Sequence, residues 1–247
     1  MMTPVRENLV IVRAGDKSLH PQWLSSAERN WDIVVSYYGD HPARYIDQYD
    51  HLHLYKGSKW QGIADYIGKN RAMINAYKYI WLPDDDLLTD TETINRFFTY
   101  CGELDLTLAQ PALTRYSYYS WEITLQNPET LCRLTDFVEI MAPCFKVETL
   151  HEFEATFTAN SSGWGLEWVW RDIAAAAGLL QFGIVDQTPV YHTRKVGSAG
   201  HGGSQQSPAS EMKKLLQESG LVMSTPRVLK QYMLPKPGPG KKNRSIR

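Results

Sequence analysis

The chain has 247 residues, of which 43% are hydrophobic and 21% charged, and its formal net charge is −1. These values describe a globular chain of one large domain, or of one domain with a tail, and they exclude collagen-like, coiled-coil and wholly disordered proteins. The sequence contains no run of about 18 apolar residues, so we expect no membrane-spanning helix, and its first residues do not resemble a secretory signal.

Charge is distributed unevenly along the sequence. Seven of the 26 basic residues, but none of the 27 acidic residues, lie from Ser224 onward. The rest of the chain is therefore acidic, and we expect no nucleic-acid partner. The basic end could contact anionic lipid, or it could be a solvated tail. Three cysteines at irregular spacing predict neither disulfides nor a zinc site, which favours a cytoplasmic protein, and contact of its basic end with lipid would make it membrane-associated.

The first half of the sequence alternates between apolar strand patterns and helical patterns. Strands are predicted at 8–13, 31–37, 51–55 and 77–82, and a helix is predicted between 59 and 76. A second helix should follow Thr89, which forms a capping box with Glu92. Its core face would be Ile94, Phe97, Phe98 and Cys101.

The second half predicts further strands at 106–110, 117–124, 137–142, 183–186 and 189–192. Helices are expected at 147–157, from Gly165 to Gly178, and in a short segment that ends near Ser219. This alternation predicts an α/β fold with a mixed, mostly parallel sheet flanked by helices. We divide the chain into a catalytic domain (1–196), a flexible loop with a short helix (197–223) and a basic Pro/Gly-rich tail (224–247).

Three adjacent carboxylates, Asp84, Asp85 and Asp86, follow an apolar strand directly. Oxygen ligands on a short loop suit Mg²⁺ or Mn²⁺, which keeps positions open for phosphate oxygens. His192 ends a late strand that a parallel sheet could bring alongside, where it would complete an Asp/Asp/His set. The alternatives are a solvated acidic turn before a helix and a structural, hydrogen-bonded histidine.

With these residues the sequence resembles nucleotide-sugar glycosyltransferases of the GT-A fold. It resembles more closely an uncharacterised domain-of-unknown-function family of plants and bacteria, over roughly residues 8 to 196. Two departures occur, since the family more often has Asp-Glu-Asp for the triplet and Asp at position 167. The resemblance is carried, in order, by Tyr77–Asp86, Gln110–Leu113 (QPAL), Phe137–Phe145 (FVEIMAPCF), Trp164–Glu167 (WGLE) and Ile184–His192 (IVDQTPVYH).

The resemblance implies a role for each candidate residue. Asp84, Asp86 and His192 would hold Mn²⁺ or Mg²⁺, and Glu167 would activate the acceptor hydroxyl as a general base. Glu167 could equally be an acid in a first helical turn, favoured there by the helix dipole. Glu139 could be structural. The nucleotide-sugar donor would contact Ala14, Gly15, Asp40, Lys56, Lys59, Asp84 and Asp85, and the acceptor would contact Trp164, Gly165 and Glu139.

Three functions remain open on this basis. The first is a metal-dependent glycosyltransferase that moves a sugar to a saccharide or lipid-linked acceptor. The second is a non-catalytic carbohydrate- or nucleotide-binding module, and the third is a metal-dependent hydrolase. Two segments could serve the first function: an aromatic run, Tyr116 to Trp121, as a carbohydrate platform, and residues 197–210 as a lid. Packing of a strand pair and a plain flexible linker are the simpler interpretations of these segments.

Overall fold

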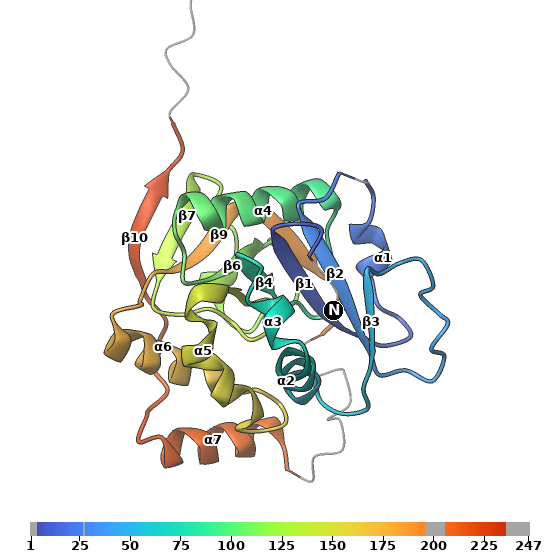
Figure 1. Ribbon diagram of the computed structural model, residues 1–247. Helices are drawn as coiled ribbons and strands as arrows, with labels where there is room; N and C mark the ends of the chain where they lie inside the picture. The colour runs from blue at the N-terminus through green and yellow to red at the C-terminus, as the bar shows by residue number, and fades with distance from the viewer. Residues whose placement is uncertain (1–3, 27, 196–205, 236–247) are drawn as a thin grey trace, which may run out of the picture.

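The computed structural model describes residues 4–26, 28–195 and 206–235. Its strands are β1 (Asn8–Ala14), β2 (Trp31–Tyr37), β3 (His51–Leu54), β4 (Tyr79–Trp81), β5 (Leu87–Leu88), β6 (Leu108–Leu113), β7 (Thr130–Thr135), β8 (Cys144–Lys146), β9 (Phe182–His192) and β10 (Val228–Met233). They form one sheet in the order β10-β7-β9-β6-β8-β4-β1-β2-β3, which runs from β10 on the left of Figure 1 to β3 on the right. β5 pairs with β9 beside this sheet. β7 and β8 run antiparallel to their neighbours, and the other strands of that order share one direction. The mixed, mostly parallel α/β architecture predicted from the sequence is confirmed.

Helices cover both faces of this sheet (Figure 1). They are α1 (His20–Trp23), α2 (Lys59–Lys69), α3 (Arg71–Ile74), α4 (Thr91–Glu103), α5 (Leu150–Phe153), α6 (Leu166–Ala177) and α7 (Pro208–Glu218), with 3₁₀ turns at Glu122–Thr124, Val147–Thr149 and Glu154–Thr158. No helix in the described ranges is long and apolar enough to cross a membrane.

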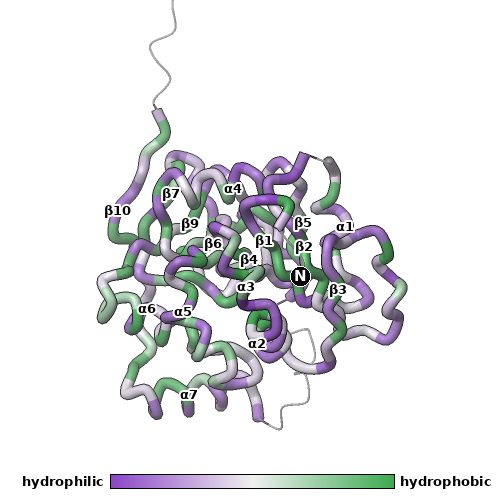
Figure 2. Tube along the Cα trace, in the orientation of Figure 1, coloured by the Kyte–Doolittle hydropathy of each residue, from purple (hydrophilic) through white to green (hydrophobic). Residues whose placement is uncertain are grey.

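The core has two layers, one on each face of the sheet. On one face Val10 and Val12 of β1 belong to a cluster with Phe97 of α4. On the other face Leu9 and Ile11 belong to a cluster with side chains of α2, α5 and α6. Because successive residues of a strand point to opposite faces, a strand covered on both sides is apolar throughout. Figure 2 shows this apolar centre beneath a hydrophilic outside.

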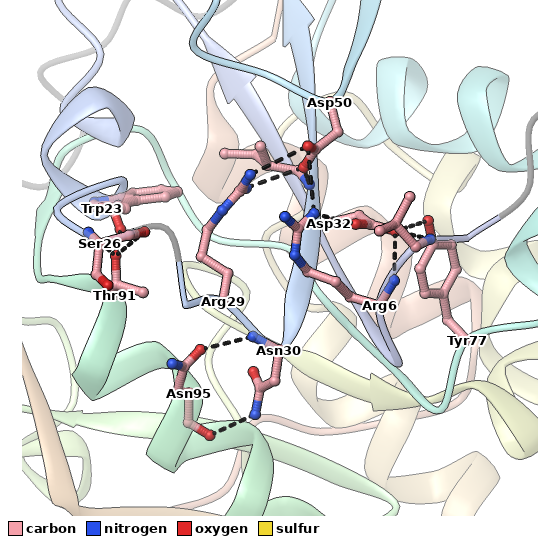
Figure 3. Close-up of polar contacts among 12 residues, drawn as sticks. Arg6, Trp23, Ser26, Arg29, Asn30, Asp32, Asp50, Tyr77, Thr91 and Asn95 are labelled. Carbon is pink, nitrogen blue, oxygen red and sulfur yellow. Dashed lines mark hydrogen bonds and ion pairs between the residues drawn. The ribbon is translucent and has the colours of Figure 1, made fainter.

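A polar network fixes the beginning of β2, at the end of the sheet opposite the acidic triplet (Figure 3). The buried Asp32 carboxylate accepts from Arg6 at 2.7 Å and from the Tyr77 hydroxyl at 2.9 Å. Asp50 accepts from the backbone N–H of Ile33 at 2.8 Å. These hydrogen bonds attach the N-terminal segment to the central strands. We therefore assign the polar residues at this end of the sheet a role in stabilising the fold.

The first half of the chain follows the predictions closely, with strands at all four predicted places and the predicted apolar face on α4. One detail is wrong: the cap of α4 is Asp90, whose side chain accepts from the backbone N–H of Thr93 at 2.8 Å, and not Thr89. Aspartate is at least as good a cap as threonine, and here it stands one residue nearer the helix.

Two predicted strands of the second half are wrong. Residues 117–124 form a loop that ends in a 3₁₀ turn, and residues 137–142 form a buried irregular segment. The strand in this region is β7 instead, at 130–135. The segment 137–142 is largely apolar because it is buried. Its backbone N–H groups, however, do not all pair with a neighbouring strand. The backbone N–H of Glu139, for example, donates to the Gln110 side chain at 2.6 Å.

The C-terminal part contains more regular structure than the sequence indicates. Beyond Ser224, residues Val228–Met233 form β10, which pairs antiparallel with β7. The helix expected to end near Ser219 is α7. The two late strands predicted at 183–186 and 189–192 are one continuous strand, β9. Residues 196–205, most of the proposed lid, lie outside the described residues, as do residues 236–247 of the basic tail.

Candidate functional site

The acidic triplet begins just after β4, at the end of the sheet where β1 and β2 also finish. Asp85 is buried there and accepts from the backbone N–H of Gly15 at 2.8 Å. Its other oxygen pairs with Arg194 at 3.0 Å. Burial raises the pKa of Asp85, although the Gly15 N–H and Arg194 act in the opposite direction. The middle carboxylate therefore joins the loop after β1 to the segment after β9.

Asp86 lies beside the histidine that the sequence singled out. The Asp86 Oδ2 atom is 3.3 Å from His192 Nε2, and both side chains are buried. The other ring nitrogen, Nδ1, lies 2.7 Å from the backbone oxygen of Tyr118, and this places the proton on Nδ1. Burial alone would lower the pKa of His192, but the hydrogen bond and charge of Asp86 outweigh it and raise that pKa.

Asp84 is paired with a lysine. Lys59 Nζ lies 2.6 Å from Asp84 Oδ1 and also donates to the backbone oxygens of Ile140 and Met141. Lys59 is the first residue of α2, and the Ser58 capping box before it fixes that position. Burial, aided by the charge of Asp86, raises the pKa of Asp84 against the opposing effect of Lys59.

The residues present suit a divalent ion in part. Asp86 Oδ1 is buried without a hydrogen-bond partner, and an oxygen in that state is a free ligand position. His192 Nε2, next to it, can supply nitrogen. Among the residues that the structure describes, however, no group of three or more His, Cys, Asp or Glu side chains is arranged to hold a metal. The described residues therefore offer two candidate ligand atoms, Asp86 Oδ1 and His192 Nε2, and no complete set of protein ligands.

The loop after β1 forms the other wall of the site. A Cβ atom at Gly15 would lie 2.5 Å from the Tyr38 hydroxyl oxygen, so the tyrosine covers this glycine. Tyr45 fixes the loop, because its hydroxyl donates a hydrogen bond to the Gly15 backbone oxygen at 2.6 Å. Tyr38 is 39% exposed and is a ring that the sequence analysis did not single out. The structure thus brings Ala14 and Gly15 next to the triplet, as predicted.

The other two residues predicted to bind the donor lie further out. Lys56 Nζ pairs with Asp40 Oδ1 at 2.6 Å and also donates to the backbone oxygens of Tyr38 and Gly39. Both side chains are mostly exposed. No contact joins this pair to the triplet, so Asp40 and Lys56 stand at the rim, behind Tyr38.

Two buried glutamates lie on the remaining side of the site. Glu167 is in the first turn of α6, after Gly165, whose φ of 96° is in the left-handed region. Burial raises the pKa of Glu167 to about 8. Burial also raises the pKa of Glu139 to about 7, and the charges of His192 and Asp84 both act on that carboxyl. Glu139 is therefore electrostatically coupled to the Asp–His side of the site.

The segment that bears the exposed tyrosines is attached directly to this site. Tyr116, Tyr118 and Tyr119 are 70%, 48% and 48% exposed. The backbone N–H and oxygen of Tyr118 both bond to His192. The predicted fourth member of the platform, Trp121, packs instead against Phe137 and Trp168.

Trp164 is half-buried beside Gly165, on the segment that leads into α6. A Cβ at Gly165 would lie 3.1 Å from Met212 of α7, so this segment is held between α6 and α7. Sequence reasoning missed Arg194, Tyr38 and Ser120, which hydrogen-bonds to Glu139. Only the position of Arg194 two residues after His192 could have indicated its place.

A separate cavity of about 1150 Å³ lies far from these residues. Tyr79 and Lys146 line it, at the beginning of β4 and the end of β8, and the triplet is at the opposite end of β4. Lys146 is paired with Asp105 and Glu148, and Arg71 is paired with Glu154. Its volume does not make it the functional site, because the perturbed acidic groups are elsewhere.

The fold is thus α/β with a mixed sheet, and the buried side chains of Asp85, Asp86 and His192 meet where parallel strands end, the usual ligand site of such sheets. No protein-family profile and no curated protein matches the sequence. Solved structures of S. aureus TarS do share the fold. The full TarS structure has a TM-score of 0.52 at 10% identity, covering 86% of this chain and 42% of that one.

Two structures of TarS residues 1–349 are also similar to this chain. One has a TM-score of 0.54 at 10% identity, over 76% of this chain and 60% of that one. The other, in complex with UDP-GlcNAc, has a TM-score of 0.56 at 12% identity, over 86% and 65%. The chain therefore spans between 42% and 65% of the TarS chains that it matches.

Proposed function

We propose that this protein is a glycosyltransferase that moves a sugar from a nucleotide-diphosphate donor to a saccharide or lipid-linked acceptor. The observation that supports it best is the contact between Asp86 and His192, at 3.3 Å, where β4 and β9 end. A fold of this kind holds UDP-GlcNAc in the TarS complex. No family model supports the narrower resemblance to the plant and bacterial family, so the proposal rests on the fold and on the geometry of the site.

We propose that the site binds a divalent ion, Mn²⁺ or Mg²⁺. Asp86 Oδ1, which has no partner, and His192 Nε2 would bind it, and Asp84 could join them by leaving Lys59. When bound, such an ion neutralises the charge that develops on a diphosphate leaving group. The Tyr118 oxygen accepts the Nδ1 proton, so Nε2 is the nitrogen that would bind the ion, in place of the proton that it can share with Asp86.

The two cations beside the triplet would serve the donor phosphates. Lys59 and Arg194 are each already paired with a carboxylate, Asp84 and Asp85 respectively. A diphosphate bound at the triplet would take over part of these pairings, because the two carboxylates that hold the cations are adjacent in the chain. The nucleoside would then lie against Gly15 and Tyr38, with Asp40 and Lys56 at the rim.

The acceptor side is formed by the glutamates and the exposed tyrosines. Trp164 and Gly165 directly precede the first turn of α6, which carries Glu167, and the backbone of Tyr118 bonds to His192. Aromatic rings with a polar hydroxyl suit the faces and edges of sugars. A basic C-terminal end would suit a protein that works in the cytoplasm near an anionic membrane, as a lipid-linked acceptor requires.

The experiment is a donor panel with a metal series. The purified full chain is incubated with UDP-, GDP-, CDP- and dTDP-sugars in Mn²⁺, Mg²⁺ or EDTA, and release of the nucleoside diphosphate is measured. Metal-dependent release from a subset of donors supports the proposal. Thermal stabilisation by a nucleotide without release would indicate the non-catalytic binding module. Phosphate release from simple esters, without a donor preference, would indicate the hydrolase.

A further inference from the structure

The two buried glutamates of the acceptor side differ in how their oxygens are used. The Glu167 carboxylate accepts from the backbone N–H of Gly165 at 3.1 Å. The backbone N–H groups of Glu167 itself and of Ile140 also hydrogen-bond to it. Its lone pairs are therefore directed at the protein backbone, in the manner of a residue that holds two segments together.

Glu139 presents the opposite arrangement. It is 6% exposed, and its Oε2 atom is buried without any hydrogen-bond partner. Its known side-chain partner is Ser120, at the end of the exposed tyrosine segment. A buried oxygen without a partner is unfavourable in an apolar setting, and a hydrogen bond from a bound hydroxyl would satisfy it.

The surroundings of Glu139 place it on the reacting side of the site. The charges of His192, Asp84 and Lys59 all act on its carboxyl. Its backbone N–H is fixed by Gln110, and the next residue along, Ile140, is held both by the Glu167 carboxylate and by Lys59. Glu167 and Lys59 thus fix the segment that carries Glu139.

We propose that Glu139 is the catalytic base that accepts the proton of the acceptor hydroxyl, and that Glu167 is a positioning residue that holds the Glu139 segment in place. This inference rests on the proposed glycosyl transfer. As the acceptor oxygen forms its bond to the anomeric carbon, the bond from that carbon to the diphosphate oxygen breaks. The diphosphate leaves with the electron pair, and the acceptor proton moves to Glu139 Oε2, from which solvent later removes it.

This assignment has a chemical basis in the environment of each group. A general base works best when its pKa is near the operating pH, and burial brings the pKa of Glu139 to about 7. The groups that act on it are Asp84, His192, Lys59 and the neighbouring Glu167. Glu167 has a similarly raised pKa, so that property does not separate the two glutamates, whereas the hydrogen bonding does.

The test compares Glu139→Gln, Glu167→Gln and a matched surface control, Glu103→Gln, in the full chain with the donor found active in the panel. Loss of the base should lower kcat for transfer by about 10²- to 10⁴-fold and abolish the acidic limb of the pH profile. UDP binding, followed by calorimetry, should stay within about twofold. Glu167→Gln should keep the acidic limb, with a smaller loss, and Glu103→Gln should match the wild type.

A second variant guards against misfolding. Glu139→Asp keeps the carboxylate but shortens its reach, so it should fold, bind UDP and lose most of its transfer rate. If Glu167→Gln is the variant that loses the acidic limb, or if Glu139→Gln keeps at least a third of kcat, this assignment is wrong while the proposed transfer stands. If the wild type releases no nucleoside diphosphate from any donor, the proposed function itself fails.

Discussion

His192 Nε2 and Asp86 Oδ2 lie 3.3 Å apart, although one residue ends β9 and the other follows β4. The contact continues into a pairing of β5 with β9, in which Leu87 is the partner of His192. Two strands that are not neighbours in the main sheet are thereby joined at the candidate site. The backbone on both sides of the contact is fixed, and this is the condition for a preorganised ligand pair.

Removing one member of this pair should remove the response to metal. In Asp86→Asn the free oxygen keeps no negative charge, so we expect Mn²⁺ binding by calorimetry to weaken at least tenfold, in line with the loss usual when the shell of a metal site is altered. Asp105→Asn, at the opposite end of β4, is the control and should bind Mn²⁺ as the wild type does. Equal Mn²⁺ affinity in both variants would contradict the assigned ion site.

The glycine of the loop after β1 should not tolerate a side chain. A Cβ at Gly15 would lie 2.5 Å from the Tyr38 hydroxyl oxygen, so Gly15→Ala must displace the tyrosine ring. This displacement would also disturb the hydrogen bond that the Gly15 N–H donates to Asp85. We expect the Kd for UDP to rise about tenfold. Gly68→Ala is the matched control, because nothing lies within 4 Å of its added Cβ and alanine favours a helix. Unchanged UDP affinity in Gly15→Ala would exclude this loop from the nucleotide site.

Lys59 should matter for the donor more than for the fold. Its ammonium group joins Asp84 to the backbone oxygens of Ile140 and Met141. In Lys59→Gln we expect the donor KM to rise about tenfold because a phosphate-binding charge is lost. Lys69→Gln, on the exposed last turn of the same helix, should leave KM unchanged. If Lys59→Gln leaves the donor KM unchanged, Lys59 is not part of the donor site.

The buried glutamates should make stability fall as pH rises. The pKa of Glu167 is about 8 in the fold against an ordinary value of 4.5. The folded protein therefore keeps this proton to higher pH than the unfolded chain does, and raising the pH from about 5 to about 8 favours unfolding. We expect the thermal midpoint in EDTA to fall over this range, by a few degrees more in the wild type than in Glu167→Gln. Parallel curves for the two proteins would show that Glu167 is not held protonated.

The sequence was sufficient for the first half of the fold because its patterns are local and strong. β2 is buried throughout and apolar at its centre, residues 33–35, and α2 begins at a capping box. The triplet is equally visible, since three adjacent carboxylates after an apolar strand are rare enough to stand out. His192 was found because it ends a strand and the predicted sheet would bring that end near the triplet.

The second half was harder because burial there does not follow from a regular ladder. Residues 137–142 are apolar enough to suggest a strand, yet the N–H of Glu139 is satisfied by the Gln110 side chain, a contact that no periodicity reveals. The difference between Glu139 and Glu167 depends on the same long-range hydrogen bonds. A sequence places a glutamate in a segment, but only coordinates show which of its oxygens is free.

The most direct test of the account is nucleoside diphosphate release by the wild type and by Asp86→Asn, measured on the donor panel with Mn²⁺ and with EDTA. The account predicts release that requires the ion in the wild type and falls at least a hundredfold in the variant, while both proteins unfold at similar temperatures. Release that persists in EDTA, or that Asp86→Asn retains in full, would contradict it.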